Sequence, residues 1–133
     1  MIEHASADAT RCSRGAAIAL AVFGASAVML GAAGAHLLAG RISATMLAVW
    51  QTAVQYQFWH TLALALALLL LPRRAARRVA VWAFAVGIVL FSGSLYALAL
   101  GAPRVLGLVT PFGGLALILG WLALGTALWP RRG

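Results

Sequence analysis

The sequence predicts an all-α membrane protein: a compact bundle of four transmembrane helices with both termini in the cytoplasm. Three observations lead to this prediction. First, 64% of the 133 residues are apolar, and the mean hydropathy is +0.99. Second, only 9% of the residues are charged, whereas a soluble domain carries about a quarter. Third, arginines separate four long apolar runs. These features exclude a soluble globule and a disordered chain.

The first two apolar runs are each long enough to cross a bilayer. A membrane helix needs about 20 apolar residues, and backbone groups in lipid must pair within their own segment, which favours helices. The first run follows Arg11 and Arg14 and covers about 15–38. The second covers 46–71 and stops at Pro72. We expect a helix over each of these ranges.

The third and fourth runs complete the bundle. The third covers 79–101 and follows a cluster of arginines between 73 and 78. The fourth covers 105–129 and ends at Pro130. The four helices are expected to form one transmembrane domain, residues 15–129. Polar tails at 1–14 and 130–133 flank it.

The arginines also predict the orientation of the helices. With four crossings, eight arginines lie on the side that holds the two tails and the middle loop, and only Arg41 and Arg104 lie on the other side. Cytoplasmic loops carry the excess of basic residues. Both termini and the loop between the second and third helices are therefore expected in the cytoplasm.

A secretory signal is the alternative interpretation of the first run. Its flanking arginines, its apolar stretch and the small residues at Ala33-Gly34-Ala35 resemble a signal peptide with a cleavage site. The run is longer than the usual 7–15 apolar residues of such a signal, which favours an uncleaved helix. Cleavage would leave three helices and an exported N-terminus.

Small residues recur at spacings of three and four along three of the runs. Such seams let helices approach closely, and van der Waals packing then drives their association in lipid. We expect Gly31, Gly87, Gly113 and Gly120 to lie at helix contacts, within a left-handed bundle.

Polar residues gather at the start of the second run, within Trp50–His60. Gln51 and Gln55 are four residues apart and share one helical face, as do Tyr56 and His60 on a neighbouring face. Gln57 points in another direction. The segment is either buried among helices or lies at the membrane interface, and the sequence leaves both interpretations open.

The predicted topology places polar residues of all four helices in the outer half of the membrane. This polar layer serves either to hold helices together by hydrogen bonds or to line a small cavity that opens outward. Its candidate members are His36, Gln51, Gln55, Tyr56, His60, Ser92, Ser94, Tyr96 and Thr110.

Catalytic and metal-binding chemistry is scarce in the runs. No Asp or Glu follows Asp8, so no carboxylate is available within the membrane as a base, a triad member or a ligand for hard metals. His36 and His60 alone are a thin ligand set. We expect no catalytic residues, no metal and no cofactor. Nucleic acid is an unsuitable partner because the chain has no long basic stripe.

Four motifs resemble the domain-of-unknown-function 423 family, which includes small bacterial inner-membrane proteins and relatives of transmembrane protein 256. The motifs are GAAGAHLL at 31–38, TAVQYQ at 52–57, LFSGSLY at 90–96 and TPFGGLA at 110–116. The resemblance covers roughly residues 20–129. It implies a four-helix protein of the bacterial inner membrane and no established activity.

Two functions are consistent with these features. The first is a non-enzymatic integral membrane protein of the plasma membrane that associates with itself or serves another membrane protein as an accessory. The alternative is a small-solute transporter or permeation subunit that uses the outward-facing polar layer. Apart from the lipid bilayer, its expected partners are a second copy or another membrane protein.

Overall fold

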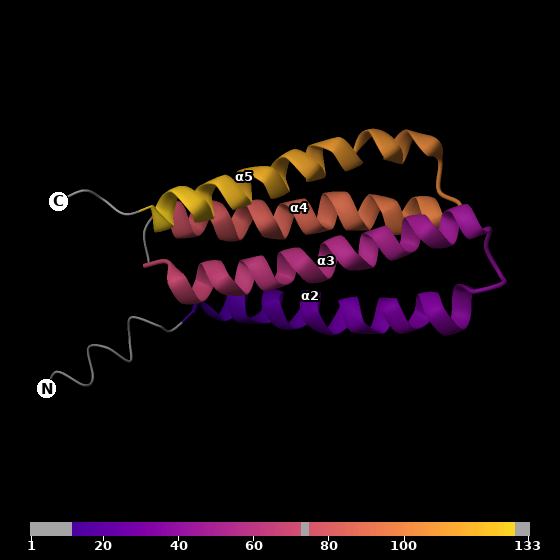
Figure 1. The fold of residues 1–133 in the computed structure, drawn as a ribbon, viewed down its shortest axis with the longest axis horizontal. Helices are drawn as coiled ribbons and strands as arrows, with labels where there is room; N and C mark the ends of the chain where they lie inside the picture. Colours follow the sequence, from indigo (N-terminus) through magenta and orange to yellow (C-terminus); the bar gives the residue numbers. More distant parts are fainter. Residues whose placement is uncertain (1–11, 73–74, 130–133) are drawn as a thin grey trace, which may run out of the picture.

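The computed structural model describes residues 12–72 and 75–129, and these form helices and short connections without any strand. A π-helical turn, η1, continues the first helix, and a 3-10 turn, η2, leads into the last one (Figure 1). The elements are α2 (Arg14–Ala33), η1 (Gly34–Leu38), α3 (Ala44–Leu70), α4 (Ala75–Ala99), η2 (Arg104–Leu108) and α5 (Thr110–Leu128).

Four spans have the length and composition of membrane helices, and this confirms the predicted all-α membrane fold. They contain 25 to 27 residues each. A helix of this length extends for about 40 Å, more than the ~30 Å of bilayer hydrocarbon. The N-terminal tail expected at 1–14 lies outside the described residues up to position 11, and the tail at 130–133 lies wholly outside them.

Local signals define where the helices begin. The hydroxyls of Ser13 and Ser43 accept hydrogen bonds from the backbone N–H groups of Ala16 and Met46, both at 3.2 Å. Each serine thereby satisfies one of the free donors at the start of its helix. The helix α3 begins two residues before the expected span, and α4 begins four residues before it.

The helices run up and down, and neighbours in sequence are neighbours in space (Figure 1). The helix α3 packs between α2 and α4, and α5 packs along α4. Burial reflects this order, because α3 has the largest buried share of the four spans and α2 has the smallest. Within α2 and η1 only Ala27 and Gly34 are buried. The first helix is therefore held at the edge of the bundle.

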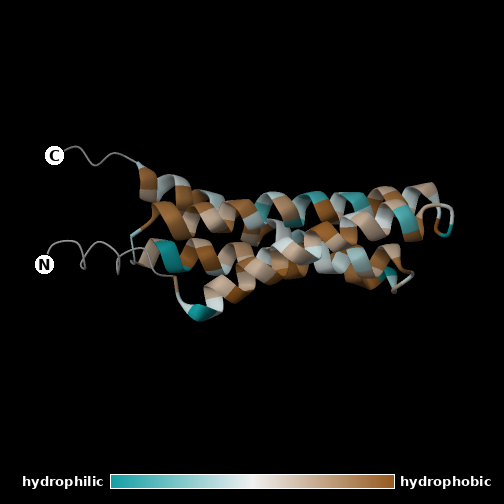
Figure 2. Cartoon of the chain, turned by 90° about the horizontal axis from the view of Figure 1, so that it is seen from below, coloured by the Kyte–Doolittle hydropathy of each residue, from teal (hydrophilic) through white to brown (hydrophobic). Residues whose placement is uncertain are grey.

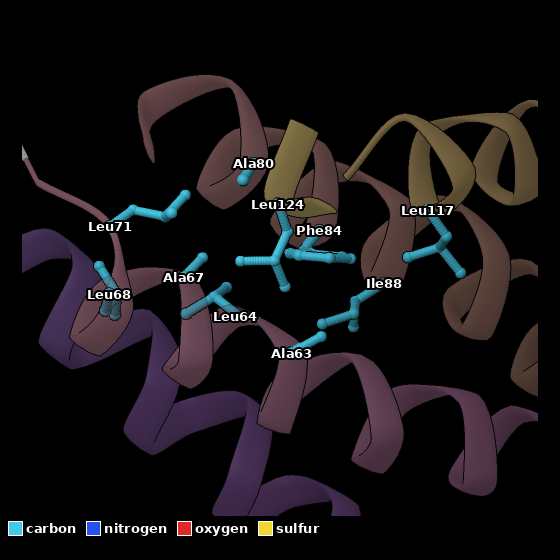
Figure 3. Close-up of a cluster of buried hydrophobic side chains, with 10 residues drawn as sticks. All are labelled: Ala63, Leu64, Ala67, Leu68, Leu71, Ala80, Phe84, Ile88, Leu117 and Leu124. Carbon is cyan, nitrogen blue, oxygen red and sulfur yellow. The ribbon is translucent and has the colours of Figure 1, made fainter. Parts of the chain in front are cut away.

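A cluster of buried apolar side chains fills the space between α3, α4 and α5 (Figure 3). Phe84 of α4 is fully buried at its centre, and its ring makes a T-shaped contact with Trp121, with centroids 5.5 Å apart. In lipid, close contact rather than exclusion of water drives such association. The cluster consists of Ala63, Leu64, Ala67, Leu68, Leu71, Ala80, Phe84, Ile88, Leu117 and Leu124.

Glycines permit the close contact between α4 and α5. A Cβ atom added at Gly113 would meet the backbone of Phe91, and one added at Gly87 would meet the side chain and backbone of Leu117. A Cβ at Gly120 would lie 2.6 Å from the ring of Phe84. Three of the four glycines expected at helix contacts thus lie in this single interface.

The fourth of these glycines, Gly31, lies between α2 and α3. A Cβ there would be 3.4 Å from the side chain of Val54, which is a tight contact without a backbone clash. The two interfaces therefore differ in how closely their backbones approach.

The outer surface of the helices is apolar, as contact with lipid requires. Large side chains such as Met29, Leu69, Trp82 and Phe112 are about two-thirds exposed or more. Figure 2 shows hydrophobic residues along the full length of the bundle, with hydrophilic ones recurring in the half that holds the α2–α3 and α4–α5 connections. A lipid environment accommodates this surface, whereas water would not.

We predict that Gly113→Ala destabilises the protein because its methyl group collides with the Phe91 backbone. Overpacking of this kind typically costs about 1–3 kcal/mol. Unfolding of the purified protein in mixed micelles measures the effect. Gly93→Ala is the matched control, since no atom beyond its chain neighbours and its own helix backbone lies within 4 Å of the added Cβ. Equal free energies of unfolding for the two variants would contradict the close α4–α5 contact.

Candidate functional site

The two ends of the bundle differ in charge and in polarity. Arg14, Arg77 and Arg78 lie where α2 and α4 begin, which we call the Arg77 end. Arg41 and Arg104 lie at the opposite end, the Arg41 end. Most intramembrane polar side chains belong to the half toward the Arg41 end (Figure 2). This half is the candidate functional site.

Gln57 of α3 joins three helices through one buried carboxamide. Its Nε2 donates to the carbonyl oxygen of Phe23 at 2.8 Å and to the hydroxyl of Ser26 at 2.7 Å, both on α2. Its Oε1 accepts a hydrogen bond from the Tyr96 hydroxyl of α4 at 2.8 Å. The side chain is 4% exposed. Both amide donors and the amide acceptor are therefore used.

Two further bonds tie α3 to its neighbours. The indole N–H of Trp50 donates to the carbonyl oxygen of Leu30 at 2.8 Å, across the α2–α3 contact. The buried hydroxyl of Ser92 donates to the carbonyl oxygen of Ala53 at 2.8 Å, across the α3–α4 contact. Gly34 makes room for the indole, because a Cβ at that position would lie 2.8 Å from the ring.

Ser94 joins α4 to the start of α5. Its hydroxyl donates to the carbonyl oxygen of Phe91 at 2.9 Å and lies 2.7 Å from the hydroxyl of Thr110. Because the Ser94 hydrogen is used in the first bond, Thr110 is the donor in the second. Each pair of neighbouring helices is thus connected by at least one polar contact.

His60 is enclosed by aromatic rings just past the middle of α3, toward the Arg77 end, and so lies outside the half in which the predicted topology placed it. It is 7% exposed, and its Nδ1 donates to the carbonyl oxygen of Tyr56 at 2.7 Å. The rings of Tyr56, Phe84 and Trp121 surround it with centroids 5.5, 6.1 and 6.2 Å away. His36, by contrast, is exposed on η1. Among the described residues no group of three or more His, Cys, Asp or Glu side chains could hold a metal ion.

The sequence candidates separate into an inner and an outer set. Ser92, Ser94 and His60 are buried, and Tyr56, Tyr96 and Thr110 are partly buried at helix contacts. The outer set consists of His36, Gln51 and Gln55, which are exposed. The segment 50–60 is therefore neither wholly buried nor wholly at a surface, because one of its faces packs inward and the opposite face points outward.

Sequence reasoning did not select three residues that make hydrogen bonds between helices: Ser26, Trp50 and Gln57. The sequence analysis paired Gln51 with Gln55 and left Gln57 out of the candidate site. Of the three glutamines, however, Gln57 is the one that faces the other helices. A usable signal was present, because Trp50, Ala53, Gln57 and His60 recur at spacings of three and four and form one helical stripe. Those four positions are the buried face of this part of α3.

An open hollow of about 180 Å³ lies between the end of α2 and α3. It is lined by small residues on one side and by the exposed glutamines on the other. Its lining consists of Gly31, Gly34, Ala35, Trp50, Gln51, Val54 and Gln55. We call the outward part of this surface the glutamine face; it consists of the exposed Ala35, Gln51 and Gln55 and the partly exposed Gly31 and Val54.

Four membrane-length helices that are joined by interior polar contacts define a small multi-pass integral membrane protein. The chain belongs to a family of proteins of unknown function, DUF423, whose family model matches residues 30–114. This confirms the family resemblance of the sequence motifs. The matched region begins at Leu30, whose carbonyl oxygen accepts the Trp50 hydrogen bond, and it ends four residues after Thr110.

Several curated relatives are similar over most of their length. The UPF0382 inner membrane protein YgdD of Escherichia coli is 40% identical over 91% of this chain and 95% of its own length. The UPF0382 membrane protein YwdK of Bacillus subtilis is 43% identical over 76% of this chain and 85% of its own length. A UPF0382 membrane protein of Staphylococcus epidermidis is 46% identical over 74% of this chain and 81% of its own length. No solved structure matches the chain significantly.

We predict that Gln57 and Tyr96 are energetically coupled. Tyr96→Phe removes one interhelical hydrogen bond, and such bonds contribute about 0.6 kcal/mol on average in a membrane protein. Gln57→Leu should cost about 1–3 kcal/mol, because it also leaves buried groups of α2 and α4 without a partner. A double-mutant cycle in mixed micelles measures the coupling.

The control for this cycle is Thr52→Ala, which removes a hydroxyl bonded only to Ala48 of its own helix. It should leave the free energy of unfolding nearly unchanged. If Tyr96→Phe were equally destabilising with and without Gln57, the two side chains would not be coupled.

Proposed function

We propose that this protein is a non-enzymatic component of the bacterial inner membrane that associates with a second copy of itself through the glutamine face. One observation carries the proposal. The polar side chains inside the bundle are hydrogen-bonded to one another or to the backbone, whereas Gln51 and Gln55 are exposed on the outer surface of α3.

The depth of the two glutamines makes a partner favourable. They follow Ala44 by 7 and 11 residues, which corresponds to about 10 and 16 Å along the helix. If α3 is centred in the bilayer, its ~40 Å length extends about 5 Å beyond the hydrocarbon at each end. Both amides then lie within the hydrocarbon, where an unpaired polar group costs several kcal/mol.

A second copy suits this surface chemically. A carboxamide is both a donor and an acceptor, so glutamines of two copies can pair across a two-fold axis. Gly31 and Ala35 line the hollow beside them, and small residues allow a neighbouring helix to approach closely. Most oligomers of this kind are symmetric dimers. The glutamine face therefore combines polar pairing with small-residue packing.

The chemistry of the described residues supports a non-enzymatic role. Residues 12–72 and 75–129 contain no Asp or Glu. The hydroxyls of Ser92 and Ser94 donate to backbone carbonyls, as does Nδ1 of His60. These groups are used in packing, and no carboxylate side chain among the described residues orients them as a base or nucleophile. The name of the Escherichia coli relative supports the inner membrane as the location.

Transport is the less favoured function. A solute pathway needs polar groups that face water, and Gln57, Ser92 and Ser94 instead pair across helix contacts. The hydrogen-bond arrangement thus supports a structural role for the inner part of the polar layer.

The proposed orientation places the Arg77 end in the cytoplasm. Both the beginning of α2 and the end of α5 lie at this end, together with the α3–α4 connection (Figure 1). The eight arginines of these segments and of the two tails exceed the two at the Arg41 end, which is the distribution of a cytoplasmic side.

We predict that the wild-type protein dimerises in bilayers and that Gln51→Leu/Gln55→Leu weakens the dimer at least about sevenfold. Two interhelical hydrogen bonds of ~0.6 kcal/mol each account for this factor. Energy transfer between two labelled populations, diluted with lipid, measures the equilibrium. Thr126→Val, an exposed polar residue of α5 near the other end, should leave it unchanged.

A photo-crosslinker at position 55 in native membranes tests the identity of the partner. A crosslinked dimer of the chain supports self-association. Crosslinking to a different membrane protein, together with a monomeric wild type in bilayers, would instead indicate an accessory role and refute the proposed dimer.

We predict that native membranes contain the full-length chain with its N-terminus in the cytoplasm. Cys12 is the only cysteine, so an impermeant thiol reagent should label it only after the cells are opened. Intact mass is measured on the same sample. A species that lacks the first ~35 residues would show that the first run is a cleaved signal. Labelling of Cys12 on intact cells would reverse the proposed orientation.

A further inference from the structure

We propose that an anionic phospholipid binds between α2 and α4 at the Arg77 end. Its phosphate occupies a basic pocket beside Arg77 and Arg78, and one acyl chain lies in the apolar groove that continues from this pocket along α4. The site is distinct from the glutamine face and does not depend on self-association.

The basic pocket has a volume of about 480 Å³, within the range of about 300–1,000 Å³ that is usual for ligand pockets. Two arginines and a serine line it together with apolar residues. Its lining consists of Ser13, Ala16, Leu68, Arg77, Arg78, Val81 and Trp82. Arginine is the side chain best suited to bind phosphate, because its planar donors match two phosphate oxygens.

Arg77 provides the strongest argument for an anion. Its side chain is only 6% exposed, and its Nη1 lies 3.5 Å from the carbonyl oxygen of Leu71 at the end of α3. A carbonyl satisfies one donor but does not balance a buried charge. The described residues contain no Asp or Glu. A phosphate in the pocket would supply the balancing charge.

The neighbouring groove suits an acyl chain. It has a volume of about 310 Å³ and is lined entirely by apolar residues of α2 and α4: Phe23, Trp82, Ala85, Val86, Val89 and Leu90. Trp82 lines both the pocket and the groove. The two hollows therefore adjoin, with the charged one at the end of the bundle.

The length of the combined site matches one leaflet. The lining positions 78, 82, 85 and 89 recur at spacings of three and four and so form one stripe on α4. From Arg78 to Val89 the helix rises about 16 Å, close to half of the ~30 Å hydrocarbon thickness. A phospholipid with its phosphate at Arg78 would thus extend its chain along the whole groove.

Because α2 is the least buried of the four spans, a lipid bound beside it would help to hold it on the bundle. The first helix packs chiefly on α3, so its seam with α4 is open over both hollows. A lipid in the seam would contact Ser13 and Phe23 on one side and α4 on the other. We therefore expect bound lipid to stabilise the attachment of α2.

Native mass spectrometry of the purified full chain tests the proposal. The probes are phosphatidylglycerol and phosphatidylcholine with identical acyl chains. Wild type should retain phosphatidylglycerol more tightly, and Arg78→Gln should reduce its affinity about fivefold, the factor expected for one basic residue near an anionic headgroup. Arg104→Gln removes the same charge from an exposed position at the other end and should have no effect.

Two further measurements separate a lipid from a free anion. Val86→Trp fills the groove without changing charge and should weaken phosphatidylglycerol binding as well, while inorganic phosphate should not raise the thermal stability of wild type. Equal retention of the two lipids would overturn the proposal. So would equal effects of Arg78→Gln and Arg104→Gln, or stabilisation by inorganic phosphate alone with Val86→Trp unaffected.

Discussion

The structure depends on the requirement that polar groups in the hydrocarbon find partners within the protein. The carboxamide of Gln57 shows how this requirement organises the bundle. Its donors reach Phe23 and Ser26 of α2, and its acceptor reaches Tyr96 of α4. One buried side chain therefore links the inward faces of three helices. The surrounding contacts are consistent with that choice, since Trp50 and the Ser92 hydroxyl bond across the same two interfaces.

The helices are held together by different means at different places. Between α4 and α5, glycines bring the backbones together and apolar side chains fill the remaining space. Between α2 and α3, few residues are buried and the specific contacts are hydrogen bonds. Dispersion depends on close contact, and it stabilises the tightly packed α4–α5 interface. Hydrogen bonds are directional, and they fix the register of the α2–α3 interface, in which α2 contributes few buried residues. Both proposed binding surfaces adjoin α2, the helix with the least internal packing.

Much of the architecture could be read from the sequence, whereas the composition of the polar layer could be read only in part. Apolar length determines a membrane helix, so the four spans and the family motifs were recognisable. The role of Gln57 was not, because periodicity tells which residues share a face but not which face meets a neighbour. Gln51 and Gln55 were a plausible pair by spacing, yet their shared face points outward and Gln57 faces α2 and α4.

The sequence by itself determined the class of protein, the number of helices and the family, since each depends on local composition and on order along the chain. Tertiary structure alone decided that His60 is enclosed by aromatic rings, that Gly34 accommodates Trp50, and that buried Arg77 shares a pocket with Ser13. Each of these pairings joins residues of different helices. Their proximity depends on the rotation and offset of one helix against another, and side-chain packing determines both.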